Sequence, residues 1–182
     1  MRRTTWVTVA VAVIALGAAG CGTSGAGAGV AAAPAPASPR PEGTAPLTKE
    51  VVRTDLDTSA AGAGVPANAP EYARVPEDAS PGSPQSCSVA FKGFGTKTAQ
   101  VDVARFKAVV SELRERDWQQ LREPKERKGA DGVIHEAQVF LTQRGWNMVA
   151  EYRNFQEGGA ITLTAIDDAC MKKNGADAGP VG

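Results

Sequence analysis

The chain contains few side chains that could build a catalytic centre. His135 is its only histidine, and it lies in a segment, residues 133–143, whose alternating apolar residues predict a strand. In that strand His135 shares a face with Val133, Ala137 and Val139, the face we expect to pack against a helix. A histidine so placed is more often a hydrogen-bonded core residue than a general base. No second histidine is present to complete a zinc site. We therefore expect no catalytic residues, no metal and no cofactor.

Two further motifs fail on their spacing. The segment KGFGTKT, residues 92–98, stands where phosphate-binding loops occur, but it lacks both the Walker spacing and the third glycine of the dinucleotide pattern. Asp167 and Asp168 form a carboxylate pair in sequence only, because neighbouring residues of a strand point to opposite faces of the sheet. Both observations argue against an enzyme built on these residues.

The first residues have the pattern of an export signal. Arg2 and Arg3 give a basic start, an apolar run extends from Trp6 to Leu16, and small residues follow as far as Cys21. The whole apolar stretch from Trp6 to Ala19, about 14 residues, is shorter than the roughly 20 that a membrane-spanning helix needs. This pattern predicts a signal peptide, exported by the general secretory or the twin-arginine route.

The residues Ala-Ala-Gly-Cys at positions 18–21 resemble the bacterial lipobox, in which a diacylglycerol is attached to the cysteine and the chain is cut just before it. Ala18 stands where lipoboxes usually carry leucine. The resemblance implies that residues 1–20 are removed and that Cys21 carries the lipid. Two acyl chains on one cysteine give a lasting membrane anchor. A signal peptide cut elsewhere and an uncleaved anchor are the alternatives.

The composition changes after Cys21. Residues 22–86 are rich in Ala, Gly, Pro and Ser, which predicts a disordered linker. The segment LTKEVVRTDLD, residues 47–57, interrupts it and predicts a transient strand or a docking segment. We therefore expect a lipidated cysteine and disordered linker over 21–86, a folded domain over 87–171 and a disordered tail over 172–182.

Two cysteines remain once Cys21 is assigned to the lipid, and they lie near opposite ends of the expected domain, at Cys87 and Cys170. A domain of about 85 residues is close to the lower limit for unaided folding. Small domains in oxidising compartments are often cross-linked. We expect a Cys87–Cys170 disulfide, with two free thiols as the alternative.

The periodicity of the expected domain predicts an α+β fold. Helical spacing predicts one helix over 102–117, and KERKGADG at 125–132 is expected to be a charged loop. Strands are expected at 88–94, 118–123 and 133–143, in a segment beginning at Trp146, and around Ile161 to Ala165. Short turns make neighbouring strands antiparallel. The expected architecture is one helix packed on a curved antiparallel sheet of about five strands.

The order of these elements resembles the cystatin-like arrangement. The layout of lipobox, Ala/Pro-rich tether and small two-cysteine domain resembles predicted lipoproteins of actinobacteria, most of which are uncharacterised. That resemblance brings no catalytic residues with it.

Strand parity predicts a candidate binding surface on the sheet face away from the helix. Its apolar members are Ile134, Phe140, Val149 and Phe155. If these four cluster, they form a patch for a partner or ligand; scattered exposure is the alternative.

The basic residues Arg122, Lys125, Arg127 and Lys128 predict a solvated loop or a contact with anionic polymer or lipid headgroups. Residues 87–182 hold 14 Lys and Arg against 13 Asp and Glu, which argues against a nucleic-acid partner.

These observations predict a lipid-anchored protein on the outer face of the cytoplasmic membrane. Its domain is expected to be a non-catalytic binding or accessory module for an envelope protein or a wall polymer. An envelope-acting hydrolase and a small-molecule carrier are the alternatives, and both would use a cavity between helix and sheet. Such a cavity requires space that is not filled by Val103, Phe106, Val110, Trp146 and Met148.

Overall fold

A computed structural model describes residues 43–155 and 158–175. The expected signal peptide, Cys21 and the first part of the expected linker lie outside these residues, as does the end of the expected tail. The described residues form a six-stranded antiparallel sheet with helices packed against it. The α+β prediction is therefore confirmed, with six strands where about five were expected.

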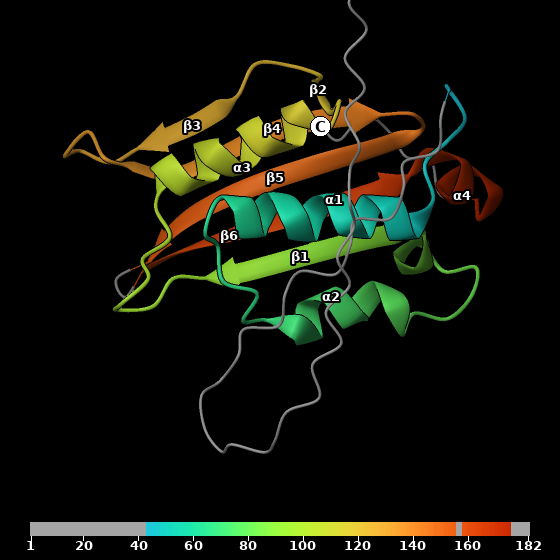
Figure 1. Ribbon diagram of the computed structural model, residues 1–182, viewed down its shortest axis with the longest axis horizontal. Coiled ribbons are helices and arrows are strands. Elements are labelled where there is room, and N and C mark those ends of the chain that lie inside the picture. Colours follow the sequence, from blue (N-terminus) through green and yellow to red (C-terminus); the bar gives the residue numbers. More distant parts are fainter. Residues whose placement is uncertain (1–42, 156–157, 176–182) are drawn as a thin grey trace, which may run out of the picture. The chain divides into compact units, whose positions relative to one another are not determined.

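The sheet follows the order β1-β6-β5-β4, and two short strands pair with the outer side of β4 (Figure 1). The strands are β1 (Ser88–Phe94), β2 (Gln119–Gln120), β3 (Lys125–Lys128), β4 (Ile134–Gln143), β5 (Trp146–Phe155) and β6 (Gly158–Asp167). Arg144 and Gly145 connect β4 to β5 with φ angles of 45° and 87°. A two-residue hairpin needs positive φ at both positions because its twist must match that of the strands.

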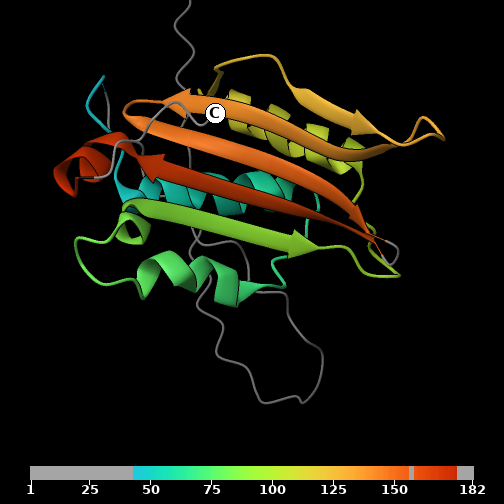
Figure 2. The same ribbon diagram turned by 180° about the vertical axis from the view of Figure 1, so that it is seen from behind.

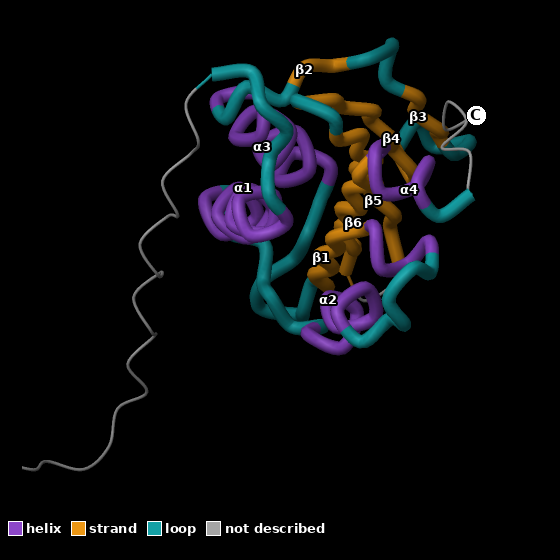
Figure 3. The backbone as a smooth tube through the Cα atoms, turned by 90° about the vertical axis from the view of Figure 1, so that its right-hand side faces the viewer, coloured by secondary structure: helices purple, strands orange, loops and turns teal. Residues whose placement is uncertain are grey.

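Two helices cover one face of the sheet, as Figure 3 shows from the side. The predicted helix is α3 (Val103–Glu115), and the Asp102 carboxylate accepts the amide N–H of Arg105 at 2.8 Å. The second helix is α1 (Lys49–Gly62), where the Thr48 hydroxyl accepts the amide N–H of Val51. Both caps satisfy amide groups that have no partner within the first turn of a helix.

The prediction of a disordered linker up to residue 86 is wrong from residue 47 onward. Leu47, Val51, Val52 and Leu56 are each at most 5% exposed and belong to the core. The spacing of Val51, Val52 and Leu56 puts them on one side of α1, with Leu47 just before the helix, so the segment docks as a helix and not as a strand. The structure then continues with α2 (Pro70–Glu77) and the 3-10 helix η1 (Pro84–Cys87).

Both fully buried tryptophans are tied to this N-terminal part of the domain. The Trp118 indole donates to a carboxylate oxygen of Asp55 at 3.0 Å, and the Trp146 indole donates to the Leu47 carbonyl at 2.9 Å. A buried indole N–H needs an acceptor, because an unpaired polar group is expensive to take out of water. The domain therefore needs residues 47–56 to complete its core.

The free edge of β1 is closed by side chains that precede it. Asn68 exchanges two hydrogen bonds with the Phe94 backbone, at 2.8 and 2.9 Å, and Arg53 donates to the Ala90 carbonyl at 2.5 Å. Helix α2 lies along the same edge (Figure 1). Backbone groups capped in this way cannot pair with a strand from another chain.

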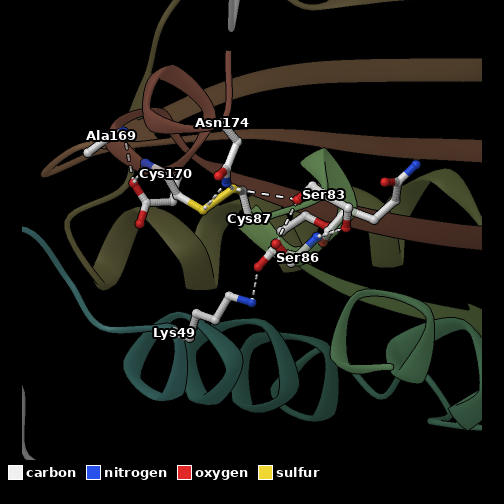
Figure 4. The surroundings of a disulfide bond; sticks show 10 residues. Lys49, Ser83, Ser86, Cys87, Ala169, Cys170 and Asn174 are labelled. Carbon is white, nitrogen blue, oxygen red and sulfur yellow. Dashed lines mark hydrogen bonds between the residues drawn. A yellow bond between two sulfur atoms is a disulfide. The ribbon is translucent and has the colours of Figure 1, made fainter. Parts of the chain in front are cut away.

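The sulfur atoms of Cys87 and Cys170 lie at bonding distance, 1.95 Å, with their Cα atoms 5.4 Å apart. The predicted disulfide is present. It joins η1 to α4 (Asp168–Lys173), and the Asn174 side chain donates to the Cys87 sulfur at 3.1 Å (Figure 4). The cross-link therefore ties the start of β1 to the segment that follows β6.

Three other expectations differ from the structure. KERK at 125–128 is strand β3 and not loop, the expected strand at 118–123 is reduced to β2, and α4 occupies the end of the expected domain and the first residues of the expected tail. Strand β3 is exposed at every residue, so it shows no apolar alternation that could have indicated it.

Candidate functional site

The four apolar residues predicted as a binding surface do not form a common exposed patch. Phe140 is only 3% exposed, because the Arg122 guanidinium lies 3.3 Å from the centre of its ring. Ile134 packs against the core, and Val149, paired with Phe140 in the sheet, is half-buried. Phe155 is 52% exposed. The structure therefore agrees with scattered exposure, and a segment distant in sequence covers the central residue.

The sheet face away from α1 and α3 is turned toward the viewer in Figure 2. Polar side chains form rows across the strands on this face. One row contains Lys125, Gln138, Glu151, Thr162 and Lys92. Within it the Gln138 amide donates to Glu151 at 2.8 Å. A shallow pocket of about 270 Å³ lies over β3, β4 and β5 on this side.

The charges of this face neutralise one another to a large extent. Arg127 pairs with Glu136 at 2.7 Å, and Arg153 lies directly opposite Glu136 on the next strand. Exposed ion pairs contribute about 0–1 kcal/mol each and weaken with salt. The face therefore suits a hydrated contact.

A second pocket, which we call the α3–β4 groove, lies between the helix and the β3 side of the sheet and has a volume of about 350 Å³. Its floor consists of buried apolar residues: Phe106 and Val110 of α3, and Ala137 and Val139 of β4. Its rim carries Lys107, Ser111, Arg114, Pro124 and Glu126. A volume of this size falls within the range of about 300–1,000 Å³ that small-molecule pockets have.

The sequence left open whether there is a cavity between helix and sheet, and the groove is a cavity of this kind. Trp146 and Met148 are each 1% exposed and fill the space beneath the helices. Phe106 and Val110 are also buried, but they leave room on the side that faces β4. The space therefore lies at one edge of the core.

An ion pair crosses the mouth of the groove. The Lys107 ammonium lies 3.4 Å from a Glu126 carboxylate oxygen, with the two side chains 61% and 30% exposed. The Arg114 guanidinium hydrogen-bonds the side chain of Gln120. The rim thus holds two cations and one anion above an apolar floor.

His135 lies outside the core, contrary to the prediction. Its side chain is 41% exposed, and its Nε2 is 3.5 Å from a carboxylate oxygen of Asp131. Val133 is 47% exposed. In Figure 1 the tip of the β3–β4 hairpin extends past the start of α3. Val133 and His135 are accordingly exposed and half-buried, even though their parity is that of the core face.

The Asp131 carboxylate has a local structural role in this hairpin. It accepts the Val133 amide N–H at 3.0 Å, and this bond holds the pKa of Asp131 below its usual value. The imidazole of His135 adds a smaller effect in the same direction. The pair closes the turn and is open to solvent.

The other carboxylate pair also serves the fold. Asp167 caps α4 by accepting the amide N–H groups of Ala169 and Cys170, at 2.9 and 3.1 Å. Asp168 accepts two hydrogen bonds from the Asn147 amide. The two carboxylates face different partners, as the sequence predicted from their adjacency, although Asp168 begins a helix and does not continue the strand.

Sequence reasoning missed Asp55, the buried carboxylate that receives the Trp118 indole, because it lies in the expected linker. The signal available was its place within the run of Leu47, Val51, Val52 and Leu56, whose spacing is helical.

Comparison with protein-family models, with curated proteins and with solved structures finds no match. Within residues 43–155 and 158–175, no three His, Cys, Asp or Glu side chains are arranged to hold a metal ion. None of the helices in this part of the chain has the length and apolar character needed to cross a membrane.

Proposed function

We propose that this chain is a lipoprotein held on the outer face of the cytoplasmic membrane through Cys21, with a domain that binds an envelope component and catalyses no reaction. The observation that carries the proposal is the Cys87–Cys170 disulfide. Structural disulfides form and persist in oxidising compartments outside the cytoplasm. The basic and apolar leader that ends at Cys21 supports the same location.

The anchor is tested by fractionating cells that express the full chain or its Cys21→Ser variant. We expect the parent protein in the membrane fraction, with the mass of a diacylated N-terminus, and the variant in the soluble extracytoplasmic fraction. Ser24→Ala is the control, because it changes a residue close to the lipobox and leaves Cys21 and the disulfide intact. A parent protein without the diacyl mass, or a Cys21→Ser variant that stays in the membrane after its leader has been removed, would contradict the anchor.

A binding role without catalysis is supported by the carboxylates of the described residues, several of which have structural roles. Asp167, Asp168 and Asp131 each hold a turn, a cap or a neighbouring side chain. The charged rows and the α3–β4 groove flank the β4 edge of the sheet, where β3 is exposed along its whole length. We assign the contact to this side of the domain.

The contact surface is tested with a photo-crosslinking side chain placed at position 127 on β3 or, as a control, at position 75 on α2. Val75 is 59% exposed and lies near the closed β1 edge. In intact cells we expect a discrete crosslinked envelope protein from position 127 and none from position 75. Equal labelling from both positions would contradict a partner surface at β3.

The α3–β4 groove favours a second candidate function, that of a small-molecule carrier. An apolar floor beneath a few polar groups is the usual construction of a ligand pocket. The two functions are compatible, because the groove and the polar rows lie on opposite faces of the sheet at β4: Ala137 belongs to the core face and Gln138 to the polar row.

A further inference from the structure

We propose that the α3–β4 groove binds an amphiphile that has a slender apolar chain and an acidic headgroup. The inference deepens the proposed binding function by naming a class of ligand, and it rests on that function. It is argued from the composition of the floor, the charges of the rim and the strength of the ion pair at the mouth.

The floor selects an apolar chain. Phe106, Val110, Ala137 and Val139 are between 2% and 6% exposed, and their side chains supply no hydrogen-bonding group. A polar ligand moiety placed there would lose its bonds to water without replacement. An alkyl chain gains free energy in proportion to the apolar area removed from water.

The rim selects an acidic headgroup. Lys107, Ser111 and Arg114 lie at spacings of four and three residues, so α3 presents them on one side, along the groove. Glu126 stands opposite as the single carboxylate of the lining. A headgroup at the rim therefore meets two cations and one anion, and a negative charge is favoured there.

The ion pair between Lys107 and Glu126 does not prevent an acidic headgroup from binding at the rim. Lys107 is 61% exposed and its contact with Glu126 is 3.4 Å long. A pair of this kind contributes about 1 kcal/mol at most. An incoming carboxylate can take the place of Glu126 at the ammonium, while Glu126 turns to solvent.

The test uses the mature chain, residues 21–182, carrying Cys21→Ser, so that neither an acyl chain nor the apolar leader competes for the groove. Decanoate and decyltrimethylammonium are titrated by calorimetry below the concentrations at which they form micelles. We expect saturable binding of one decanoate per chain, and binding of the ammonium compound at least tenfold weaker. The two probes share the same alkyl chain and differ in the sign of the headgroup.

A matched pair of tryptophan variants locates the ligand. Ser111→Trp puts a bulky side chain at the mouth, whereas Ala108→Trp puts the same side chain on exposed α3 surface outside the groove lining. We expect Ser111→Trp to weaken decanoate binding at least tenfold and Ala108→Trp to leave it unchanged. Arg114→Glu, at an exposed rim position, is expected to abolish the preference for the acid.

Three outcomes would overturn the inference: absence of saturable decanoate binding, equal affinity of the two tryptophan variants, or equal affinity for the two headgroups. Thermal unfolding of each variant verifies that it is folded. If Ser111→Trp does not fold, the test of the groove rests on the headgroup preference of Arg114→Glu. Membrane release by Cys21→Ser and crosslinking from position 127 do not depend on the groove. Their success without decanoate binding would remove the ligand class and leave the proposed binding function standing.

Discussion

The two edges of the sheet are finished in different ways. At the β1 edge, Asn68 and Arg53 cap backbone groups, α2 lies alongside, and the Cys87–Cys170 disulfide fixes the start of the strand. At the β4 edge, two short strands share the pairing, and β3 is exposed at every residue. The first edge is closed by contacts from other parts of the domain, and the second is left accessible.

This difference indicates where stability and binding are located. The β1 edge is closed by contacts between segments that are distant in the sequence. A substitution that removes one of these contacts should therefore lower the free energy of unfolding. The β4 side carries the charged rows and the α3–β4 groove, and few core contacts depend on its rim. Substitutions near β1 should therefore change stability, and substitutions at β3 should change mainly binding.

Removing the disulfide should have the largest effect. The bond closes a loop of 83 residues, and in the chain-entropy treatment such a loop contributes about 4.5 kcal/mol by restricting the unfolded chain. We expect Cys87→Ser combined with Cys170→Ser to lower the free energy of unfolding by about that amount in urea titrations. Reduction of the parent protein should give the same midpoint, and a loss below about 1 kcal/mol would show that the loop is restricted by other means.

The second largest loss of stability is expected from truncating a side chain on the core side of α1. Leu56 is fully buried, and Leu→Ala at such positions costs about 2–5 kcal/mol. Leu121, close to the β4 edge, is 57% exposed, so Leu121→Ala should change stability by about 0.5 kcal/mol or less. Chemical unfolding of both variants measures the contrast. Equal effects would mean that residues 49–62 are not part of the cooperative unit.

The edge contacts themselves can be compared directly. Asn68→Ala removes two hydrogen bonds to the β1 backbone, and we expect a loss of about 1 kcal/mol that does not depend on salt. Arg127→Ala removes an exposed ion pair on β3 and should cost less, with the difference disappearing at high salt. Thermal unfolding at low and high ionic strength separates them. The reverse salt dependence would contradict the assignment of the two edges.

The smallest expected effect concerns Asp57 on α1. Asp57 is an exposed residue, but partial desolvation of its carboxyl group raises its pKa above the usual value of 3.8; Arg53 opposes this, and Glu77 adds to it. A carboxyl group with a raised folded-state pKa binds its proton more tightly when folded, so stability falls as the pH rises through and above 3.8. Asp57→Asn should therefore stabilise the protein at pH 7, by about 0.5 kcal/mol or less.

This gain should vanish in acid, below the unfolded-state pKa, where the parent carboxyl is protonated in both states. Unfolding midpoints recorded across acid and neutral pH measure the effect. An Asn variant less stable than the parent at pH 7 would show that the attraction of Arg53 outweighs burial.

The sequence predicted the parts of the fold that have strong local periodicity. Strand β5 alternates clearly and α3 has helical spacing, so each element could be derived from its own residues. Helix α1 was missed because its surroundings are rich in Ala, Gly and Pro, although Ala is also the best helix former. A helical reading of Leu47, Val51, Val52 and Leu56 would have found it.

The candidate site could not be derived in the same way, because it depends on contacts between distant segments. Phe140 has the parity of an exposed residue, yet Arg122 covers it. His135 has the parity of a core residue, yet its hairpin extends beyond α3. The α3–β4 groove brings α3 together with β4 and the approach to β3, and its size depends on the separation of these elements, which no local pattern specifies.

The cross-link described above also determines how the molecule would respond to a pulling force. When tension is applied through chain ends on either side of Cys87 and Cys170, the 83-residue loop between them cannot lengthen, which withholds about 280 Å of extension at roughly 3.4 Å per residue. Helices α1 and α2 precede the bond and carry the load first. A stretched chain would therefore lose its N-terminal helices first, while the disulfide prevents residues 87–170 from being extended.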